Sequence, residues 1–332
     1  MGRTHAQTAL NSGKRFLTAG GVETYLMFQQ GFPLRQFAAF EVFADDQAFA
    51  KLIDRHLRPV ADAALRGGFG LILDCMVYKA SPDALSALGY GADDLARVNR
   101  NAVEHMGGFA ASWRAESGDA ARALPILTVA DLGPRGDGYG LGDDEPLSVE
   151  AARAYHRQQI AALVAADVDL LAAYTQTNVN EAVGIALAAK ELEAPILISA
   201  TVETDGHLPD GTPLGDFIER VDAATGGYPL FYMVNCAHPL HLEPTLTAAA
   251  TAGAAWLSRF RGVRANASSK SHEELDNSPE LDRGDPADFG KRLAALAHAH
   301  SLCVMGGCCG TDAEHIEAAA AHHAIAEAKE AG

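Results

Sequence analysis

The sequence predicts a single-domain (β/α)8 barrel, the TIM barrel fold, that spans residues 1–332. Three observations lead to this fold. Eight short apolar segments alternate with longer Ala-rich segments, no Pro/Ser/Gly-rich linker divides the chain, and its length suits one α/β barrel. Strands that alternate with helices form parallel βαβ units, and eight such units can close into a barrel. The alternative is an open doubly wound sheet, but no G-x-G-x-x-G or P-loop motif follows any strand.

Each predicted strand is a short run dominated by Leu, Ile, Val and Ala, as a strand buried on both faces requires. In chain order, these strands cover residues 15–19, 70–74, 124–130, 168–174, 195–201, 230–235, 262–265 and 302–306. The segments between them have helical composition and length. The clearest predicted helices cover residues 47–66, 92–115, 148–166, 181–191 and 285–300.

Three of the five cysteines fall where predicted strands end. Cys236 closes the sixth strand, and Cys308 and Cys309 follow the eighth within the run Gly306-Gly307-Cys308-Cys309-Gly310-Thr311. A disulfide between the adjacent Cys308 and Cys309 would close a strained ring, so a shared metal ion explains the pair better. Among the abundant divalent ions, a site rich in thiolates selects zinc. Barrel chemistry lies at the carboxyl ends of strands, and three protein ligands leave one coordination position open for a substrate. The alternative is that Cys236 is a core residue and the pair is accidental.

Composition restricts the classes of partner. A formal net charge of −17 argues against binding to nucleic acid or to an anionic membrane surface. No apolar run approaches the roughly 18 residues of a membrane span, and the N-terminus lacks the apolar core of a signal peptide. Five cysteines without a disulfide framework fit a reducing compartment. We therefore expect a cytoplasmic protein that acts on small molecules, and nothing in the sequence indicates its oligomeric state.

With these motifs the chain resembles the homocysteine S-methyltransferases, zinc-dependent barrel enzymes that transfer a methyl group to a thiol. The resemblance covers nearly the whole chain and is strongest at Gly306 to Thr311 and at Val234-Asn235-Cys236. Weaker matches are Gly20-Gly21-Val22-Glu23-Thr24, Tyr78-Lys79-Ala80-Ser81, Leu132-Gly133-Pro134 and Asp210-Gly211-Thr212-Pro213-Leu214. The resemblance implies that Cys236, Cys308 and Cys309 bind Zn²⁺ and form the catalytic centre.

The implied reaction uses zinc to prepare a nucleophile. A free thiol, with a pKa of about 8.5, is mostly protonated at neutral pH, and a zinc-bound thiolate removes that obstacle. Because methyl transfer needs a good leaving group, the donor should be an onium compound such as S-methylmethionine or betaine. Homocysteine is the leading acceptor by resemblance, which would make methionine the product and methionine biosynthesis the process.

Two departures from the family pattern concern the acceptor. Family members usually carry an Asp and a Glu that hold the amino group of homocysteine, and here Ala19 and Tyr174 occupy those positions. An unpaired ammonium in a partly desolvated site costs several kcal/mol. Either the acceptor is a different thiol, or other carboxylates bind the amine. Glu23 and Asp74, at the ends of the first two strands, are the candidates.

The remaining candidates are weaker. Tyr174, Asn235 and Asn266 are predicted substrate contacts, and Asn235 could also orient the neighbouring cysteine. Two alternative functions stay open: a cysteine-nucleophile hydrolase that pairs Cys236 with His238, and a non-catalytic barrel tied by a four-ligand zinc. The histidines of the last helix, His315, His322 and His323, could indicate a second metal site, but no carboxylate completes a compact ligand set, and we expect them on a solvated surface.

Overall fold

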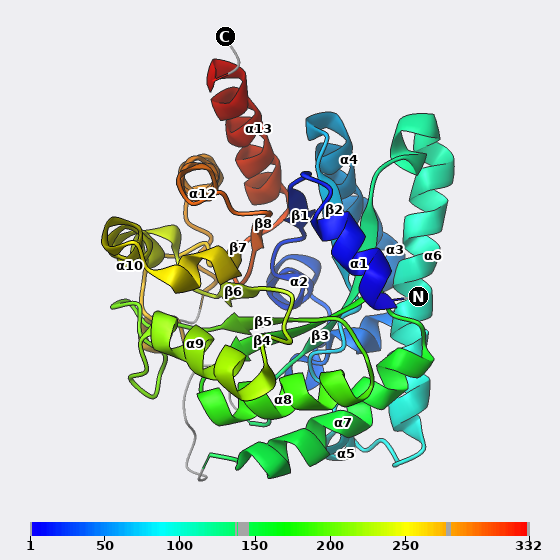
Figure 1. Ribbon diagram of the computed structural model, residues 1–332. Helices are drawn as coiled ribbons and strands as arrows, with labels where there is room; N and C mark the ends of the chain where they lie inside the picture. The colour runs from blue at the N-terminus through cyan, green and yellow to red at the C-terminus, as the bar shows by residue number, and fades with distance from the viewer. Residues whose placement is uncertain (1, 137, 139–145, 277–279, 331–332) are drawn as a thin grey trace.

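The computed structural model describes residues 2–136, 138, 146–276 and 280–330. Its eight parallel strands pair in sequence order, and β1 closes the barrel against β8 (Figure 1). Every predicted strand is confirmed, with each boundary within two residues of the prediction. The strands are β1 (Phe16–Thr18), β2 (Gly70–Asp74), β3 (Ile126–Leu132), β4 (Leu170–Gln176), β5 (Ile196–Ala200), β6 (Tyr232–Asn235), β7 (Phe260–Ala265) and β8 (Val304–Gly307).

Helices surround the ring of strands (Figure 1). The α-helices are α1 (Gly2–Leu10), α2 (Val22–Thr24), α3 (Asp46–Leu52), α4 (Arg58–Gly67), α5 (Pro82–Ala87), α6 (Asp94–Arg122), α7 (Val149–Ala165), α8 (Val179–Glu191), α9 (Leu214–Thr225), α10 (Pro239–Ala252), α11 (His272–Asp276), α12 (Pro286–Ala299) and α13 (Ala313–Glu330). Two π-helical segments are η1 (Tyr25–Gln30) and η4 (Ile53–Leu57), and three 3-10 segments are η2 (Arg35–Phe37), η3 (Ala39–Ala44) and η5 (Ala255–Arg259). Within the described residues, no helix combines the length and apolar character needed to span a membrane.

The predicted helix over residues 47–66 is divided into α3, η4 and α4. Pro59 stands in the first turn of α4 and has no N–H to donate to the preceding turn, so the chain widens into a π-helical segment before α4 begins. The predicted helix over residues 92–115 is extended in the structure to Arg122, across a non-helical Gly118.

Two apolar layers stabilise the barrel. The larger layer lies between the strands and the outer helices. The smaller one fills the barrel interior, where Phe16, Leu170 and Phe231 pack together with Leu10 of α1. Helix α1, which the sequence did not predict, therefore contributes to the interior packing. Since this apolar layer fills part of the interior, polar and charged side chains of the barrel gather toward the carboxyl ends of the strands.

Candidate active site

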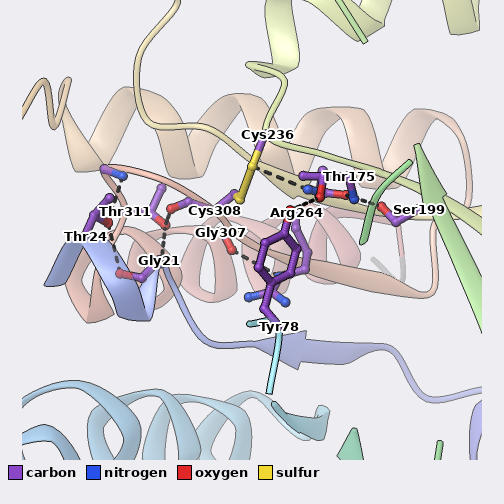
Figure 2. The surroundings of a disulfide bond; sticks show 12 residues. Gly21, Thr24, Tyr78, Thr175, Ser199, Cys236, Arg264, Gly307, Cys308 and Thr311 are labelled. Atoms are coloured by element: carbon purple, nitrogen blue, oxygen red, sulfur yellow. Dashed lines mark hydrogen bonds between the residues drawn. A yellow bond between two sulfur atoms is a disulfide. The ribbon is translucent and has the colours of Figure 1, made fainter. Parts of the chain in front are cut away.

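The three predicted cysteines converge at the carboxyl ends of β6 and β8. Their sulfur atoms all lie within 4.8 Å of one another. Cys236 and Cys308 are joined by a disulfide, with their Cα atoms 5.4 Å apart, and Cys309 follows directly (Figure 2). A metal binds cysteine through the thiolate, so the Cys236–Cys308 pair must be reduced before all three sulfurs can act as ligands.

Backbone and amide hydrogen bonds fix the two cysteine segments. The Cys236 N–H donates to the carbonyl oxygen of Arg264 (3.0 Å), and the Cys308 N–H donates to that of Ala265 (2.7 Å). Asn235 donates from Nδ2 to Cys236 Sγ (3.4 Å). Its Oδ1 accepts hydrogen bonds from Thr175 N–H (2.9 Å) and the Ser199 hydroxyl (2.7 Å). Asn235 therefore contacts a cysteine sulfur and lies in the cavity wall, while its predicted contact with a substrate stays a prediction.

A cavity of about 290 Å³ opens over this cluster. Its polar lining includes the three cysteines together with Glu23, Asp74, Tyr78, Lys79, Asp131, Tyr174, Thr175, Asn235 and Arg264. Three lining residues within two positions of the carboxyl end of a strand have positive φ angles: Met76 (60°), Thr175 (51°) and Cys236 (59°). Strained non-glycine backbone of this kind is concentrated at functional sites because the surrounding structure must hold it in place.

An ion pair occupies one side of the cavity. Arg264 Nη1 lies 2.9 Å from Asp74 Oδ2, and both side chains are buried. Tyr174 donates its hydroxyl to Asp74 Oδ1 (3.1 Å), and the guanidinium carbon lies 4.6 Å from the centre of the Tyr174 ring. Burial raises the pKa of Asp74, although the charge of Arg264 opposes that effect. Asp74 and Tyr174 thus line the cavity as predicted, but the Asp74 carboxylate is already paired.

Two further charged residues in the cavity were missed by the sequence analysis. Asp131 accepts hydrogen bonds from Val77 N–H (3.0 Å) and Tyr78 N–H (3.2 Å). Burial, and then the charges of Asp74 and Glu23, raise the pKa of Asp131 well above its ordinary value. The third strand was predicted to end one residue before Asp131, and Arg264 is the one charged residue of the predicted seventh strand over residues 262–265. A charged residue in such a strand was the available signal.

Glu23 is the least constrained carboxylate of the cavity. It lies in α2, and within the described part of the chain no basic side chain forms an ion pair with it. Burial raises the pKa of Glu23 more than its own backbone N–H and the charge of Arg264 lower it. The group is therefore available to a positively charged ligand.

Two residues considered from the sequence lie elsewhere. Asn266 is buried but is not among the residues that line the cavity, and its N–H donates to Ala237 (3.1 Å). His238 is the N-cap of α10, where its Nδ1 accepts a hydrogen bond from Leu240 N–H (3.3 Å). Burial lowers the pKa of His238 to about 4. A ring whose Nδ1 lone pair is engaged in this way is a poor base for Cys236, which disfavours the hydrolase alternative.

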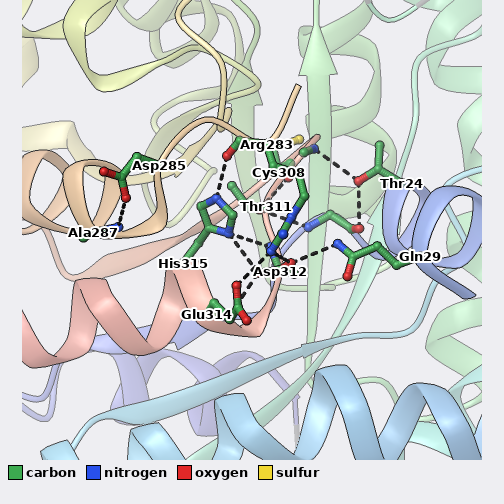
Figure 3. A network of polar contacts seen from close by, with 12 residues as sticks. Thr24, Gln29, Arg283, Asp285, Ala287, Cys308, Thr311, Asp312, Glu314 and His315 are labelled. Atoms are coloured by element: carbon green, nitrogen blue, oxygen red, sulfur yellow. Dashed lines mark hydrogen bonds and ion pairs between the residues drawn. The ribbon is translucent and has the colours of Figure 1, made fainter. Parts of the chain in front are cut away.

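A buried polar network supports the cysteine loop from behind (Figure 3). His315 Nδ1 lies 2.9 Å from Asp312 Oδ1, and its Nε2 lies 2.8 Å from the carbonyl oxygen of Arg283. Asp312 also accepts a hydrogen bond from Gln29 (2.9 Å) and pairs with Arg283. The expectation of a solvated surface is wrong for His315 and His323, which are both buried. His315, in the first turn of α13, packs against Phe289 of α12, and His323 packs against Phe69.

The fold and the site together define a class: a closed (β/α)8 barrel with a cluster of three cysteines at the carboxyl ends of β6 and β8. A model of the family described as homocysteine S-methyltransferase matches residues 30–323. The chain therefore belongs to the homocysteine S-methyltransferase family.

Individual relatives agree with this assignment. The chain is 32% identical to a homocysteine S-methyltransferase of Escherichia coli over 178 residues. This matched segment covers 52% of this chain and 54% of the relative. The chain is 29% identical over 228 residues to the homocysteine S-methyltransferase YbgG of Bacillus subtilis, which covers 63% and 65%, respectively. The matched segments thus span between about half and two thirds of these relatives.

Solved structures match over nearly the whole chain. The oxidised form of the homocysteine methyltransferase MmuM from Escherichia coli has a TM-score of 0.71 and 25% identity, covering 95% of this chain and 99% of that one. The metallated form of the same protein has a TM-score of 0.69 and 25% identity, covering 94% and 96%.

Proposed function

We propose that this protein transfers a methyl group from an onium donor to a metal-bound thiolate, with homocysteine as the acceptor and methionine as the product. The observation that carries the proposal is the convergence of three cysteine sulfurs within 4.8 Å in the wall of a cavity of small-molecule size. The relatives from Escherichia coli and Bacillus subtilis are homocysteine S-methyltransferases, which supports homocysteine as the methyl acceptor. S-methylmethionine, betaine or a similar compound would supply the methyl group.

The cysteine set fits a zinc ion. A tetrahedral ion with Zn–S bonds of about 2.3 Å holds its sulfurs about 3.8 Å apart, which is compatible with the observed cluster. Cys236, Cys308 and Cys309, once reduced, would be its ligands. Within the described residues, no fourth His, Cys, Asp or Glu joins the group, which argues against a closed structural site. Bound zinc would supply a site where the substrate thiol ionises and remains nucleophilic.

The carboxylates of the cavity would bind the acceptor's ammonium group. Glu23 and Asp74 were the candidates from the sequence, but Arg264 already pairs with Asp74. We therefore assign the ammonium to Glu23 and Asp131, which both line the cavity and lack an ion pair within the described residues. Charge pairing in a desolvated cavity would orient the substrate, and orientation supplies much of the rate of a displacement that needs little acid or base.

The proposed chemistry also supports a cytoplasmic location. Cys236 and Cys308 form a disulfide in the structure, and the reaction requires both as thiolates. A reducing compartment maintains that state.

Zinc content, homocysteine binding and methionine formation, measured on one reduced sample, test the proposal. We expect about one zinc per chain, homocysteine binding that requires the metal, and methionine when S-methylmethionine or betaine is added. Cys308→Ala should abolish all three. Cys303→Ala is the matched control, because Cys303 is a buried cysteine of the barrel interior and not of the cluster. Absence of zinc from reduced, metal-supplied protein would refute the proposal, whereas zinc without homocysteine binding would point to another thiol.

A further inference from the structure

Arg264 lies between the two segments that carry the cysteines. Strand β7 pairs with β6 on one side and with β8 on the other, and in this register Arg264 is the partner of both Asn235 and Gly306. Asn235 directly precedes Cys236, and Gly306 stands two residues before Cys308. On β7, the strand between β6 and β8, Arg264 is therefore the residue in register with both cysteine segments.

Arg264 also contacts both segments directly. Its carbonyl oxygen accepts the hydrogen bond from Cys236 N–H (3.0 Å). Its side-chain Nε donates to the carbonyl oxygen of Gly307 (3.2 Å), the residue immediately before Cys308 (Figure 2). One residue thus binds the chain at Cys236 through its backbone and the chain at Cys308 through its side chain.

The guanidinium itself is held on two further sides. Asp74 of β2 pairs with Nη1 at 2.9 Å, and the Tyr174 ring of β4 lies 4.6 Å from the guanidinium carbon. A planar guanidinium can make these contacts and the Gly307 hydrogen bond at the same time, whereas the compact ammonium of lysine cannot. The Arg264 side chain is 9% exposed, so its position is fixed by these partners and not by solvent.

We propose that Arg264 is a positioning residue for the metal ligands. It holds the Cys236 and Cys308 segments at the separation that a shared ion requires, and it fixes that pair relative to Asp74 and Tyr174 across the barrel. This inference rests on the proposed function, since it assumes that the cysteines bind zinc. Groups that orient metal ligands from outside the coordination sphere typically contribute 10–100-fold to metal affinity.

Zinc affinity of the reduced, metal-free protein tests this role without reference to catalysis. Competition with a chromophoric chelator should show at least about tenfold weaker binding for Arg264→Met and Arg264→Lys. Arg264→Lys retains the positive charge, so weaker zinc binding by that variant reflects the loss of the planar guanidinium and its several N–H donors. If Arg264→Met fails to fold, Arg264→Lys carries the test alone.

Arg259 provides a matched control, because it is a partly buried arginine near the other end of the same strand. It pairs with Asp222 at 2.7 Å and donates to Pro229 and Leu230. Arg259→Lys should lower thermal stability and leave zinc affinity within about twofold of wild type. Zinc affinity of both Arg264 variants within twofold of wild type would overturn the inference. If wild-type protein binds no zinc, the proposed function itself fails first, and the two failures are thereby distinguished.

Discussion

The hydroxyl of Tyr174 donates a hydrogen bond to Asp74 Oδ1 at 3.1 Å. This contact spans the barrel interior from β4 to β2. It gives Tyr174 and Asp74 each other as partners, where the sequence predicted that both would contact the substrate. Tyr174 stands where the family resemblance implies a carboxylate for the substrate amine, yet here it supplies a donor to a carboxylate of the protein. Burial, and then the charge of Asp74, raise the pKa of Tyr174, so the hydroxyl stays protonated and able to donate.

The first prediction concerns the pH dependence of homocysteine binding. Burial raises the pKa values of Glu23 and Asp131, so these groups lose their charge at a higher pH than ordinary carboxyls. We expect homocysteine affinity to fall as pH decreases from neutral toward 5, and Glu23→Gln to weaken binding at neutral pH by about tenfold. Calorimetry across this pH range measures the effect.

A thiol without an amine provides the control for that experiment. The compound 4-mercaptobutyrate has the homocysteine skeleton without its ammonium group, so it reports the pH dependence of the thiol and the metal alone. Its affinity should be nearly equal in wild type and Glu23→Gln. An equal loss for both thiols would show that Glu23 does not bind the amine.

The second prediction is that the same substitution stabilises the ligand-free protein. Since the pKa of Glu23 is raised in the folded state, its contribution favours folding at low pH and is lost as pH rises through the folded pKa. Glu23→Gln removes this buried carboxylate and should therefore raise the unfolding free energy at pH 7. Glu104→Gln, at an exposed position of α6, should change it by less than about 0.5 kcal/mol.

The sequence was sufficient for the strands and for the cysteine cluster. Both follow from local pattern, because apolar runs mark the strands and the carboxyl ends of barrel strands meet at one face. The sequence was insufficient to predict that Arg264 and Asp131 line the cavity. Whether a charged side chain in a strand points into the barrel or away from it depends on how the barrel closes. The Asp74–Arg264 pair joins residues of β2 and β7, and no local pattern links positions so far apart.

The third prediction concerns Asn235. Its Nδ2 donates to Cys236 Sγ at 3.4 Å, so Asn235→Asp removes a donor and places a negative charge beside a thiolate. Zinc affinity of the reduced protein should fall at least about tenfold. Ser199→Ala removes only one hydrogen bond to Asn235 Oδ1 and should have a much smaller effect. Similar affinities for both variants would mean that the amide does not orient the sulfur.

The fourth prediction concerns the network behind the cysteine loop. His315→Ala removes the imidazole partner of the Arg283 carbonyl oxygen and one hydrogen bond to Asp312, which keeps its contacts with Gln29 and Arg283. The loss should lower the unfolding free energy by about 1–3 kcal/mol. His322, on the same helix, is partly exposed, and His322→Ala should cost less than about 0.5 kcal/mol. Denaturant titration compares the two, and equal stabilities would show that the His315 contacts are energetically neutral.

The last prediction concerns the contact between the loop after β1 and the cysteine loop. A Cβ added at Gly21 would lie 2.5 Å from the carbonyl oxygen of Cys308 and 3.0 Å from its carbonyl carbon. These are backbone atoms, so they cannot turn aside as the end of a flexible side chain would. Gly21→Ala should therefore displace Cys308 from Cys236 and weaken zinc binding by at least about tenfold.

Gly107 is the matched control, because a Cβ added there, in α6, would meet no atom within 4 Å. Gly107→Ala should leave zinc affinity unchanged and stabilise the helix by up to about 1 kcal/mol. Zinc titration and thermal unfolding of both variants separate the two effects. If Gly21→Ala bound zinc as tightly as wild type, the cysteine loop would tolerate displacement, and the close approach of Gly21 would serve packing instead of the metal site.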